Sequence, residues 1–206
     1  TLLNLRTIPQ RLGSSGVAIV GIAGVVIVLV SVLLIGQGFS AAVEQSGSDS
    51  RALVMRSGAD SEMTSGLGAQ EVDLIKQAPG LRREGQTGLA SAELYVIIDI
   101  PKIGTNTPAN VPMRGVEPQA AQVREEFSIV EGRMFQFGTN EVVVGRGAKV
   151  NFQGLTLGNT IHSGQIAFQV VGVFETDGSI AETEIWIDAR ILQGAYRRGN
   201  TFQTVL

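Results

Sequence analysis

One long stretch without charge constrains this chain more than any other feature. No Asp, Glu, Lys or Arg occurs from Leu12 to Val43, and residues 17–35 are almost entirely Val, Ile, Leu, Ala and Gly. About 20 helical residues, each rising about 1.5 Å, span a hydrocarbon core of about 30 Å. The sequence therefore predicts a transmembrane helix, with its extension, over residues 16–40. The residues assigned to this span include Val17, Ile22, Val26, Leu29, Leu33 and Ile35.

Two other interpretations of the apolar stretch are weaker. A cleaved signal peptide would have a shorter apolar core, although residues 36–38 (Gly-Gln-Gly) could mimic a processing region. A core helix of a soluble protein would carry a polar face, and such helices rarely run this long without one. We therefore expect a span that stays in the mature protein.

The charges beside the span predict its orientation. Arg6 and Arg11 precede it, and no acidic residue occurs before Glu44. Positively charged flanks stay on the cytoplasmic side of a membrane. Residues 1–15 are therefore predicted to be a cytoplasmic or interfacial segment, and residues 41–206 to lie outside the cytoplasm.

Composition excludes several functions. The chain has 206 residues and no cysteine, so it has no thiolate ligand for zinc or an iron–sulfur cluster and no cysteine nucleophile. Its formal net charge of −3 argues against a nucleic-acid partner, because nucleic-acid-binding proteins usually carry a basic stripe.

The predicted elements of residues 41–206 indicate an α+β domain with a split β-α-β layer and a β-rich insertion. The outer parts cover about 51–126 and 183–206, and the insertion covers about 127–176. The predicted strands are 52–55, 91–100, 111–116, 127–130, 141–144, 160–162, 165–174, 184–188 and 201–206. The predicted helices are 69–78, 117–126, 146–152 and 189–197, and a loop is expected over 101–112.

No enzymatic motif occurs in the sequence. It lacks the GxxxxGK[ST] phosphate loop, the GxSxG nucleophile elbow and the HExxH zinc motif. The only histidine, His162, is expected to be a solvated residue beside a turn, because a lone histidine with no carboxylate spacing nearby is not a metal site. We therefore predict no catalytic, cofactor-binding or metal-binding residue and no cofactor in this chain.

Paired charges and the single tryptophan have ordinary structural explanations. The acidic pairs could serve acid–base chemistry, but a solvated position at the edge of an element is the more common case. The basic doublets are too short for a nucleic-acid footprint and could meet lipid headgroups or a partner. Trp186 is expected in the core, with anchoring of a partner as the alternative. The acidic pairs are Glu125-Glu126 and Glu182/Glu184, and the basic doublets are Arg82-Arg83 and Arg197-Arg198.

Five short motifs follow the apolar helix. They are MRGVEP at 113–118, VEGRMF at 130–135, NEVVVG at 140–145, LGNTI at 157–161 and FQVVGVF at 168–174. Together with the leading Asn4-Leu5-Arg6 and one span, this succession resembles the MacB-type periplasmic core domain of ABC transporter permeases, the FtsX-like and lipoprotein-release group. The resemblance covers nearly the whole chain.

The resemblance implies a permease with four spans and a periplasmic domain between the first two, in the bacterial inner membrane. Such a permease dimerises, couples to cytoplasmic ATP-binding domains, and commonly works with a periplasmic adaptor and an outer-membrane channel. ATP-driven motion then passes to a porter subdomain and an inserted β-rich subdomain outside the membrane. Because this chain has no ATPase motif, ATP and Mg²⁺ are expected on a separate subunit.

The chain departs from the complete family pattern. It lacks the last three spans, begins with Thr1 rather than Met, and ends inside a strand pattern, so we expect a piece of a longer permease. The ectodomain of a single-span membrane sensor is the alternative function, and a membrane-anchored enzyme or assembly factor is a third. Further spans after Leu206 would favour the permease.

Overall fold

The computed structural model describes residues 12–46, 48, 50–85, 87–164 and 166–206. The chain divides into two compact units, Thr1–Glu44 and Gln45–Leu206. The predicted cytoplasmic flank with Arg6 and Arg11 lies outside the described residues.

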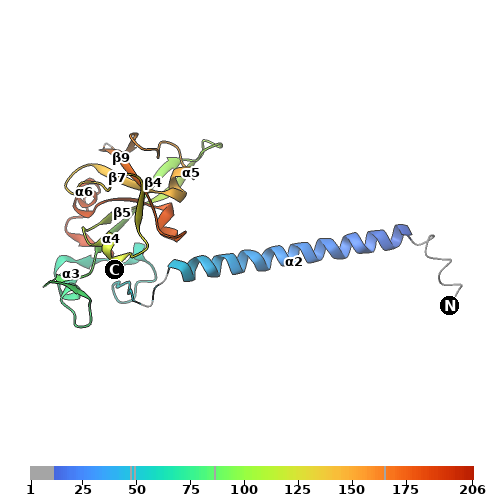
Figure 1. Ribbon diagram of the computed structural model, residues 1–206, viewed down its shortest axis with the longest axis horizontal. Coiled ribbons are helices and arrows are strands. Elements are labelled where there is room, and N and C mark those ends of the chain that lie inside the picture. The colour runs from blue at the N-terminus through green and yellow to red at the C-terminus, as the bar shows by residue number, and fades with distance from the viewer. Residues whose placement is uncertain (1–11, 47, 49, 86, 165) are drawn as a thin grey trace. The chain divides into compact units, whose positions relative to one another are not determined.

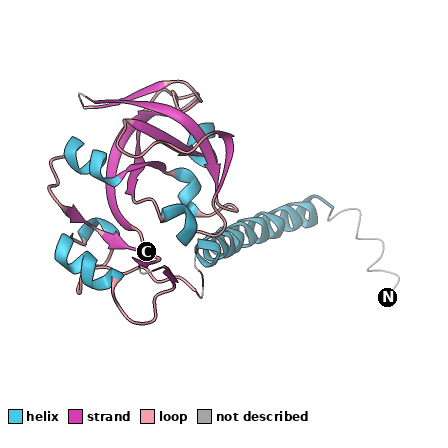
Figure 2. Cartoon of the chain, turned by 60° about the vertical axis from the view of Figure 1, so that its left-hand side comes forward, coloured by secondary structure: helices cyan, strands magenta, loops and turns pink. Residues whose placement is uncertain are grey.

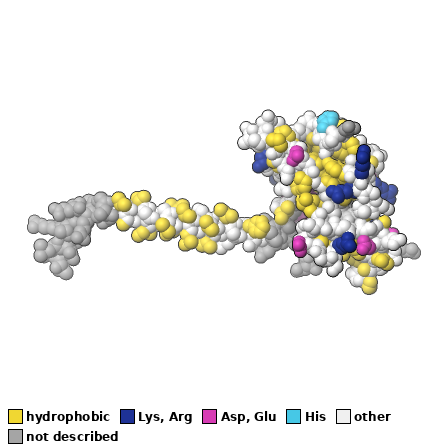
Figure 3. All heavy atoms as spheres, turned by 180° about the vertical axis from the view of Figure 1, so that it is seen from behind, with side chains coloured by type: hydrophobic (Ala, Val, Ile, Leu, Met, Phe, Trp, Pro, Cys, Tyr) yellow, Lys and Arg dark blue, Asp and Glu magenta, His cyan; other side chains and the backbone are white. Residues whose placement is uncertain are grey.

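The described part of the first unit is one helix, α2 (Leu12–Ser46), whose last two residues belong to the second unit. Its stretch Gly16–Ser40 is long and apolar enough to cross a membrane and has the bounds predicted from the sequence. Apolar side chains cover its described length (Figure 3). The six residues named for the span are 50–75% exposed. A helix that is apolar on every side and not buried by other residues suits a hydrocarbon surrounding.

The second unit is built on a curved eight-stranded sheet with two short sheets beside it (Figures 1 and 2). The strand order is β12-β4-β5-β10-β7-β9-β6, with β8 also paired to β9. β5 and β10 are parallel, as are β7 and β9, and the other pairs are antiparallel. The bounds are β4 Ala92–Pro101, β5 Pro108–Val116, β6 Ser128–Gly132, β7 Glu141–Gly145, β8 Thr160–Ser163, β9 Ile166–Glu175, β10 Ile185–Asp188 and β12 Thr204–Val205.

Short helices and two small sheets complete this unit. One small sheet pairs β1 with β11, and the other pairs β2 with β3. The helices are α3 Ala69–Lys76, α4 Ala120–Val123, α5 Arg146–Asn151 and α6 Ala189–Ala195, with 3-10 turns η2 Glu62–Thr64 and η3 Ile180–Thr183. The small strands are β1 Leu67–Gly68, β2 Arg83–Glu84, β3 Thr87–Gly88 and β11 Thr201–Phe202.

Most predicted elements are confirmed, with shifted bounds. The strands predicted over 91–100 and 111–116 are present as β4 and β5, which pair as a hairpin, but β5 begins at Pro108, so the predicted loop 101–112 is shorter. The helix predicted over 117–126 is only the single turn α4. Strands from the predicted insertion and from the outer parts share one sheet, because β10 pairs with both β5 and β7. The finer division into subdomains stays a prediction.

The prediction of a buried strand over residues 52–55 is wrong. Only Val54 pairs there, in a single bridge to Val205, and the side chains of Leu53 and Val54 are 43% and 36% exposed. The partner strand β12 has just two residues, so it offers too little backbone for a longer ladder. The apolar composition of residues 52–55 indicated a strand, but β12 is too short to pair with all of them.

The two faces of the sheet pack different cores. On β4, Leu94, Val96, Ile98 and Ile100 alternate onto one face, as predicted, and enter the largest apolar cluster. On β10, Ile185 and Ile187 join the same cluster, whereas Trp186 belongs to another cluster on the opposite face. The side chains of β4 and β5 that alternate with the core residues point to this opposite face, and they include the charged Glu93 and Arg114.

Candidate functional site

A cluster of charged and aromatic side chains occupies the second face of the sheet. Arg114 of β5 lies opposite Tyr95 of β4 on one side and opposite Trp186 of β10 on the other. Glu93 precedes Tyr95 by two residues, so it points to the same face of β4. Strand alternation thus places these side chains together on the face opposite the main core.

Arg114 is the centre of the cluster. Its Nε and Nη2 donate to the two carboxylate oxygens of Glu184 at 2.7 and 2.8 Å. Its Nη1 donates to Glu93 at 2.9 Å. The same guanidinium reaches Glu62 of η2 at 2.6 and 3.1 Å. Arg114 of β5 therefore contacts β4, η2 and the residue between η3 and β10, because the planar guanidinium of arginine can donate to several carboxylates at once.

A second arginine, Arg124, completes the cluster and directly follows the last residue of α4. Arg124 donates to both oxygens of Glu93, at 2.7 and 2.9 Å. Its guanidinium carbon lies 4.8 Å from the centre of the Trp186 ring, an arrangement favourable for a cation–π contact. Trp186 donates its indole N–H to Glu184 at 2.9 Å and stacks on Phe127, with ring centres 5.0 Å apart.

The cluster is almost fully shielded from water. The exposed fraction is 0% for Glu93, 4% for Glu184, 5% for Arg114 and 8% for Arg124. These four residues carry two positive and two negative charges, so their sum is zero. The carboxylate of Glu62 is the fifth charge, and its side chain is 25% exposed. Buried charges persist only when they are paired and hydrogen-bonded in this way.

The arginines keep the buried carboxylate charged. Burial would raise the pKa of Glu93, but the charges of Arg124 and Arg114 and their hydrogen bonds outweigh it, so this pKa lies below its ordinary value of 4.5. Burial also opposes the charged form of Arg114, yet its carboxylate partners, Glu184 foremost, hold the pKa of Arg114 well above its ordinary value. Both groups are charged at neutral pH.

We expect the stability of the second unit to fall as the pH drops below about 4.5. A pKa that is lower in the folded than in the unfolded chain stabilises the fold above the unfolded-state value, and this contribution is lost as the pH falls through the folded-state value. Thermal unfolding followed by fluorescence from about pH 7 to about pH 3 measures it. The decline should be shallower in a Glu93→Gln variant, and an equal decline in both chains would contradict this assignment.

Several cavities open on the described surface of the second unit, and two of them concern the site. One, of about 380 Å³, borders the cluster and is lined partly by Arg51, Glu62 and Tyr95. Each charged residue lining it is held in an ion pair, as Arg51 is with Glu126. The other, of about 580 Å³, lies between α3 and α6. Within the described ranges, no three His, Cys, Asp or Glu side chains are grouped as a metal ion would need.

The residues singled out in the sequence have different outcomes. His162 is exposed on β8, as expected, and Trp186 is completely buried, as expected. Glu125 is solvated beside Arg82, whereas Glu126 is partly buried and paired with Arg51. The Glu182 carboxylate accepts hydrogen bonds from the Thr176 and Gly178 N–H groups. The residues Arg82, Arg83, Arg197 and Arg198 are exposed.

The solvated position predicted for Glu184 is wrong. Its carboxylate is buried against Arg114, because η3 approaches the sheet closely: the Gly145 N–H donates to the Glu184 carbonyl at 2.9 Å. A side chain at Gly145 would overlap the backbone of Glu182, so only glycine fits there. The motif NEVVVG ends at this glycine.

Sequence reasoning missed Glu93, Arg114, Arg124 and Glu62 as a group. A signal existed for two of them. Glu93 interrupts the apolar strand SAELYVIIDI, and Arg114 interrupts the VPMRGV strand. A charge inside an otherwise apolar strand indicates a buried partner, because an unpaired buried charge is costly. The partners themselves are 21 to 70 residues apart, so their identity needed the fold.

The described chain is thus an α+β unit that follows one helix long and apolar enough to cross a membrane. The chain belongs to the MacB-like periplasmic core domain family, whose model matches residues 15–206. This confirms the predicted family and the α+β fold class. Homologous domains are components of ABC transporter permeases and are not catalytic domains. No curated protein is significantly similar to the chain in sequence.

Two solved structures share the fold. The extracellular domain of the noncanonic ABC-type transporter YknZ from Gram-positive bacteria superposes with a TM-score of 0.53 and 14% identity, covering 74% of this chain and 79% of that one. The periplasmic region of MacB from Actinobacillus actinomycetemcomitans superposes with a TM-score of 0.53 and 14% identity, covering 74% of this chain and 71% of that one. At this identity the likeness concerns the fold alone.

Proposed function

We propose that the chain is part of an ABC transporter permease that passes ATP-driven conformational change to a domain outside the membrane. In this proposal the span 16–40 crosses the bacterial inner membrane, residues 1–15 face the cytoplasm and residues 41–206 lie in the periplasm. The family match and the apolar helix support the permease class. The two arginines before the span support the orientation.

The observation that carries the proposal is the pairing of the two ends of the second unit. Val54 and Val205 exchange backbone hydrogen bonds of 2.8 and 3.0 Å, and Ser91 of the chain beside β4 exchanges two of 2.9 Å with Leu206. The segment that follows the helix and the last residues are therefore attached side by side to one edge of the sheet. A displacement of the helix would reach the sheet at this edge.

The proposed assembly follows from the family. The permease forms a homodimer and binds a separate ATP-binding subunit, which holds ATP and Mg²⁺. A periplasmic adaptor and an outer-membrane channel are further proposed partners, so that the domain docks an adaptor or a substrate during efflux. No nucleic-acid partner is proposed, in line with the net charge of −3.

Affinity purification of the tagged full-length protein from cross-linked native membranes tests this function. We expect an ATP-binding subunit to copurify and a Leu29→Arg variant to lose it, because a charge at the centre of a span costs about 3 kcal/mol of insertion energy. The conservative Leu29→Val variant is the matched control and should retain the subunit. Recovery of no ATP-binding subunit would overturn the permease proposal and favour a sensor.

A further inference from the structure

The segment that connects the helix to the sheet is held differently from the rest of the second unit. Residues 50–65, the linking segment, follow α2 after a short gap and lead to β1. None of their apolar side chains is buried: Leu53 is 43%, Val54 36% and Met63 60% exposed. Ser65 is the single buried residue of this segment. Apolar burial, which holds β4 in place, contributes little here.

Polar contacts attach the linking segment to the sheet instead. Arg51 pairs with Glu126 at 2.6 Å, and the Ser65 hydroxyl donates to the Gln203 carbonyl at 2.5 Å. The backbone bridge between Val54 and Val205 lies between these contacts. The Ser65–Gln203 hydrogen bond is buried and the Arg51–Glu126 pair is partly buried, yet one hydrogen bond contributes only modestly to stability, because folding exchanges it for bonds to water.

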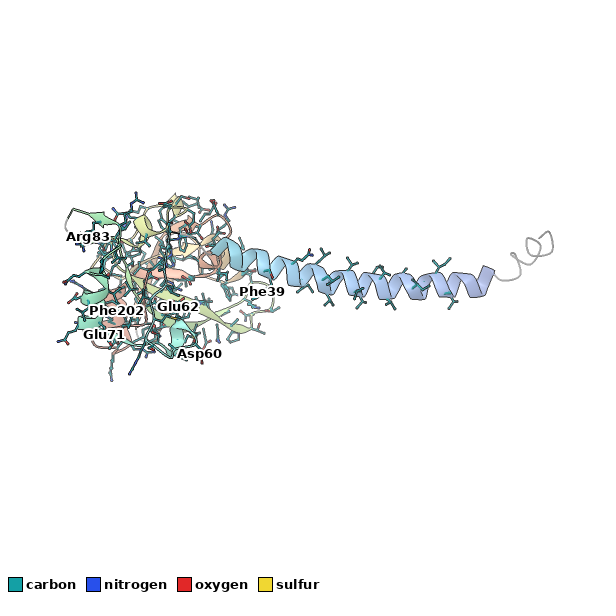
Figure 4. The ribbon with its side chains drawn as sticks, turned by 90° about the horizontal axis from the view of Figure 1, so that it is seen from below. Phe39, Asp60, Glu62, Glu71, Arg83 and Phe202 are labelled. Atoms are coloured by element: carbon teal, nitrogen blue, oxygen red, sulfur yellow. The ribbon has the colours of Figure 1, made fainter. Side chains whose placement is uncertain are left out.

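The contact of Glu62 with Arg114 is the attachment that reaches the charge cluster, and two hydrogen bonds join the carboxylate to the guanidinium. Glu62 is half-buried, whereas its neighbour Asp60 is exposed; both are labelled in Figure 4. Without Glu62, Arg114 keeps its bonds to Glu184 and Glu93, and the buried cluster has two positive and two negative charges. Departure of Glu62 therefore leaves no uncompensated buried charge, and its carboxylate returns to water.

We propose that the linking segment is a releasable clamp. It detaches from the sheet as one unit when the Glu62–Arg114 contact opens, while β4, β5 and β10 stay joined by the neutral remainder of the cluster. Opening and closing would set how firmly the membrane helix is coupled to the sheet. This effect on coupling rests on the proposed function, whereas release of the linking segment does not.

Hydrogen exchange on the full chain in lipid nanodiscs tests the release. The informative amide is that of Val54, which donates to the Val205 carbonyl across the contact that opens, compared with the amides of β4. We expect the linking segment to exchange at least about tenfold faster than β4. A Glu62→Gln variant should exchange about tenfold faster still in the segment and unchanged in β4, because it loses one charge-assisted contact.

Two controls make the result specific. Glu125→Gln removes a solvated carboxylate that pairs with Arg82 outside the cluster and should change neither region. A disulfide between Val54→Cys and Val205→Cys, in a chain that has no other cysteine, should abolish the effect of Glu62→Gln.

Three results would overturn the proposal. They are equal exchange of segment and β4 in the unchanged chain, equal acceleration of both by Glu62→Gln, and no acceleration of the segment. The readout needs no ATP-binding subunit, so it fails independently of the proposed function. If the linking segment is released but the chain recruits no ATP-binding subunit, the clamp is supported and its role in transport is not.

Discussion

Replacing Glu93 by glutamine is expected to lower the free energy of unfolding of the second unit by about 3–5 kcal/mol. The carboxylate is fully buried and is the partner of both Arg114 and Arg124. Its neutralisation leaves Arg124 facing no charged carboxylate among the described residues, and Arg114 facing Glu184 and the half-exposed Glu62. Removing one member of a buried ion pair costs far more than the pair contributes, because the remaining charge has lost both water and partner.

The single tryptophan makes this loss measurable. Trp186 lies against Arg124 inside the cluster, so its fluorescence reports unfolding at the substituted site. For a unit of this size, a loss of about 3–5 kcal/mol corresponds to a fall of about 6–20 °C in the unfolding temperature. The full chain in detergent is the appropriate sample.

The control for Glu93→Gln is Glu125→Gln, which removes a carboxylate that is 73% exposed. Its effect should stay within about 0.5 kcal/mol. A double variant, Glu93→Gln with Arg124→Met, restores the balance of charge and should recover part of the loss. Glu93→Gln within about 1 kcal/mol of the unchanged chain would show that the cluster does not hold the strands together.

Replacing Trp186 by alanine is expected to cost about 3–5 kcal/mol as well, for a different reason. The ring is fully buried and contacts Phe127, Phe174 and Arg124. Truncation opens a cavity between the sheet and the residues that cover its second face, and removes the indole N–H that satisfies Glu184. Circular dichroism measures this unfolding, because the fluorescent residue is gone.

Trp186→Phe separates packing from hydrogen bonding. Phenylalanine keeps an aromatic ring beside Phe127 and loses the N–H donor, so we expect a loss of about 1–2 kcal/mol. Equal losses for alanine and phenylalanine would contradict a role in packing. Because Trp186 and Glu93 share Arg124 and Glu184 as neighbours, the effects of Trp186→Ala and Glu93→Gln should not add.

The sequence predicted the elements far better than their partners. The span over 16–40 and the β4–β5 hairpin follow from local patterns, since apolar length and strand alternation are properties of neighbouring residues. The strand predicted at 52–55 was wrong because a strand needs a partner ladder, and the one available, β12, is two residues long. The family emerged from the order of motifs, most of which mark strand ends.

The charge cluster shows what local patterns cannot supply. Glu184 was expected in water because it stands at the edge of an element, and its partner Arg114 lies 70 residues away. Glu93 and Arg114 were visible as charges inside apolar strands, but the register that brings them together is a property of the assembled sheet.

For this protein, the sequence alone determined an uncharged apolar span, most of the longer strands and helices behind it, and the family. Each of these depends on residues close together in the chain. Only the tertiary structure decided that Glu62, Glu93, Arg114, Arg124 and Glu184 meet. The reason is physical: a buried charge is stable only beside its partners, and those partners come from elements that the folded sheet, and not the chain order, makes neighbours.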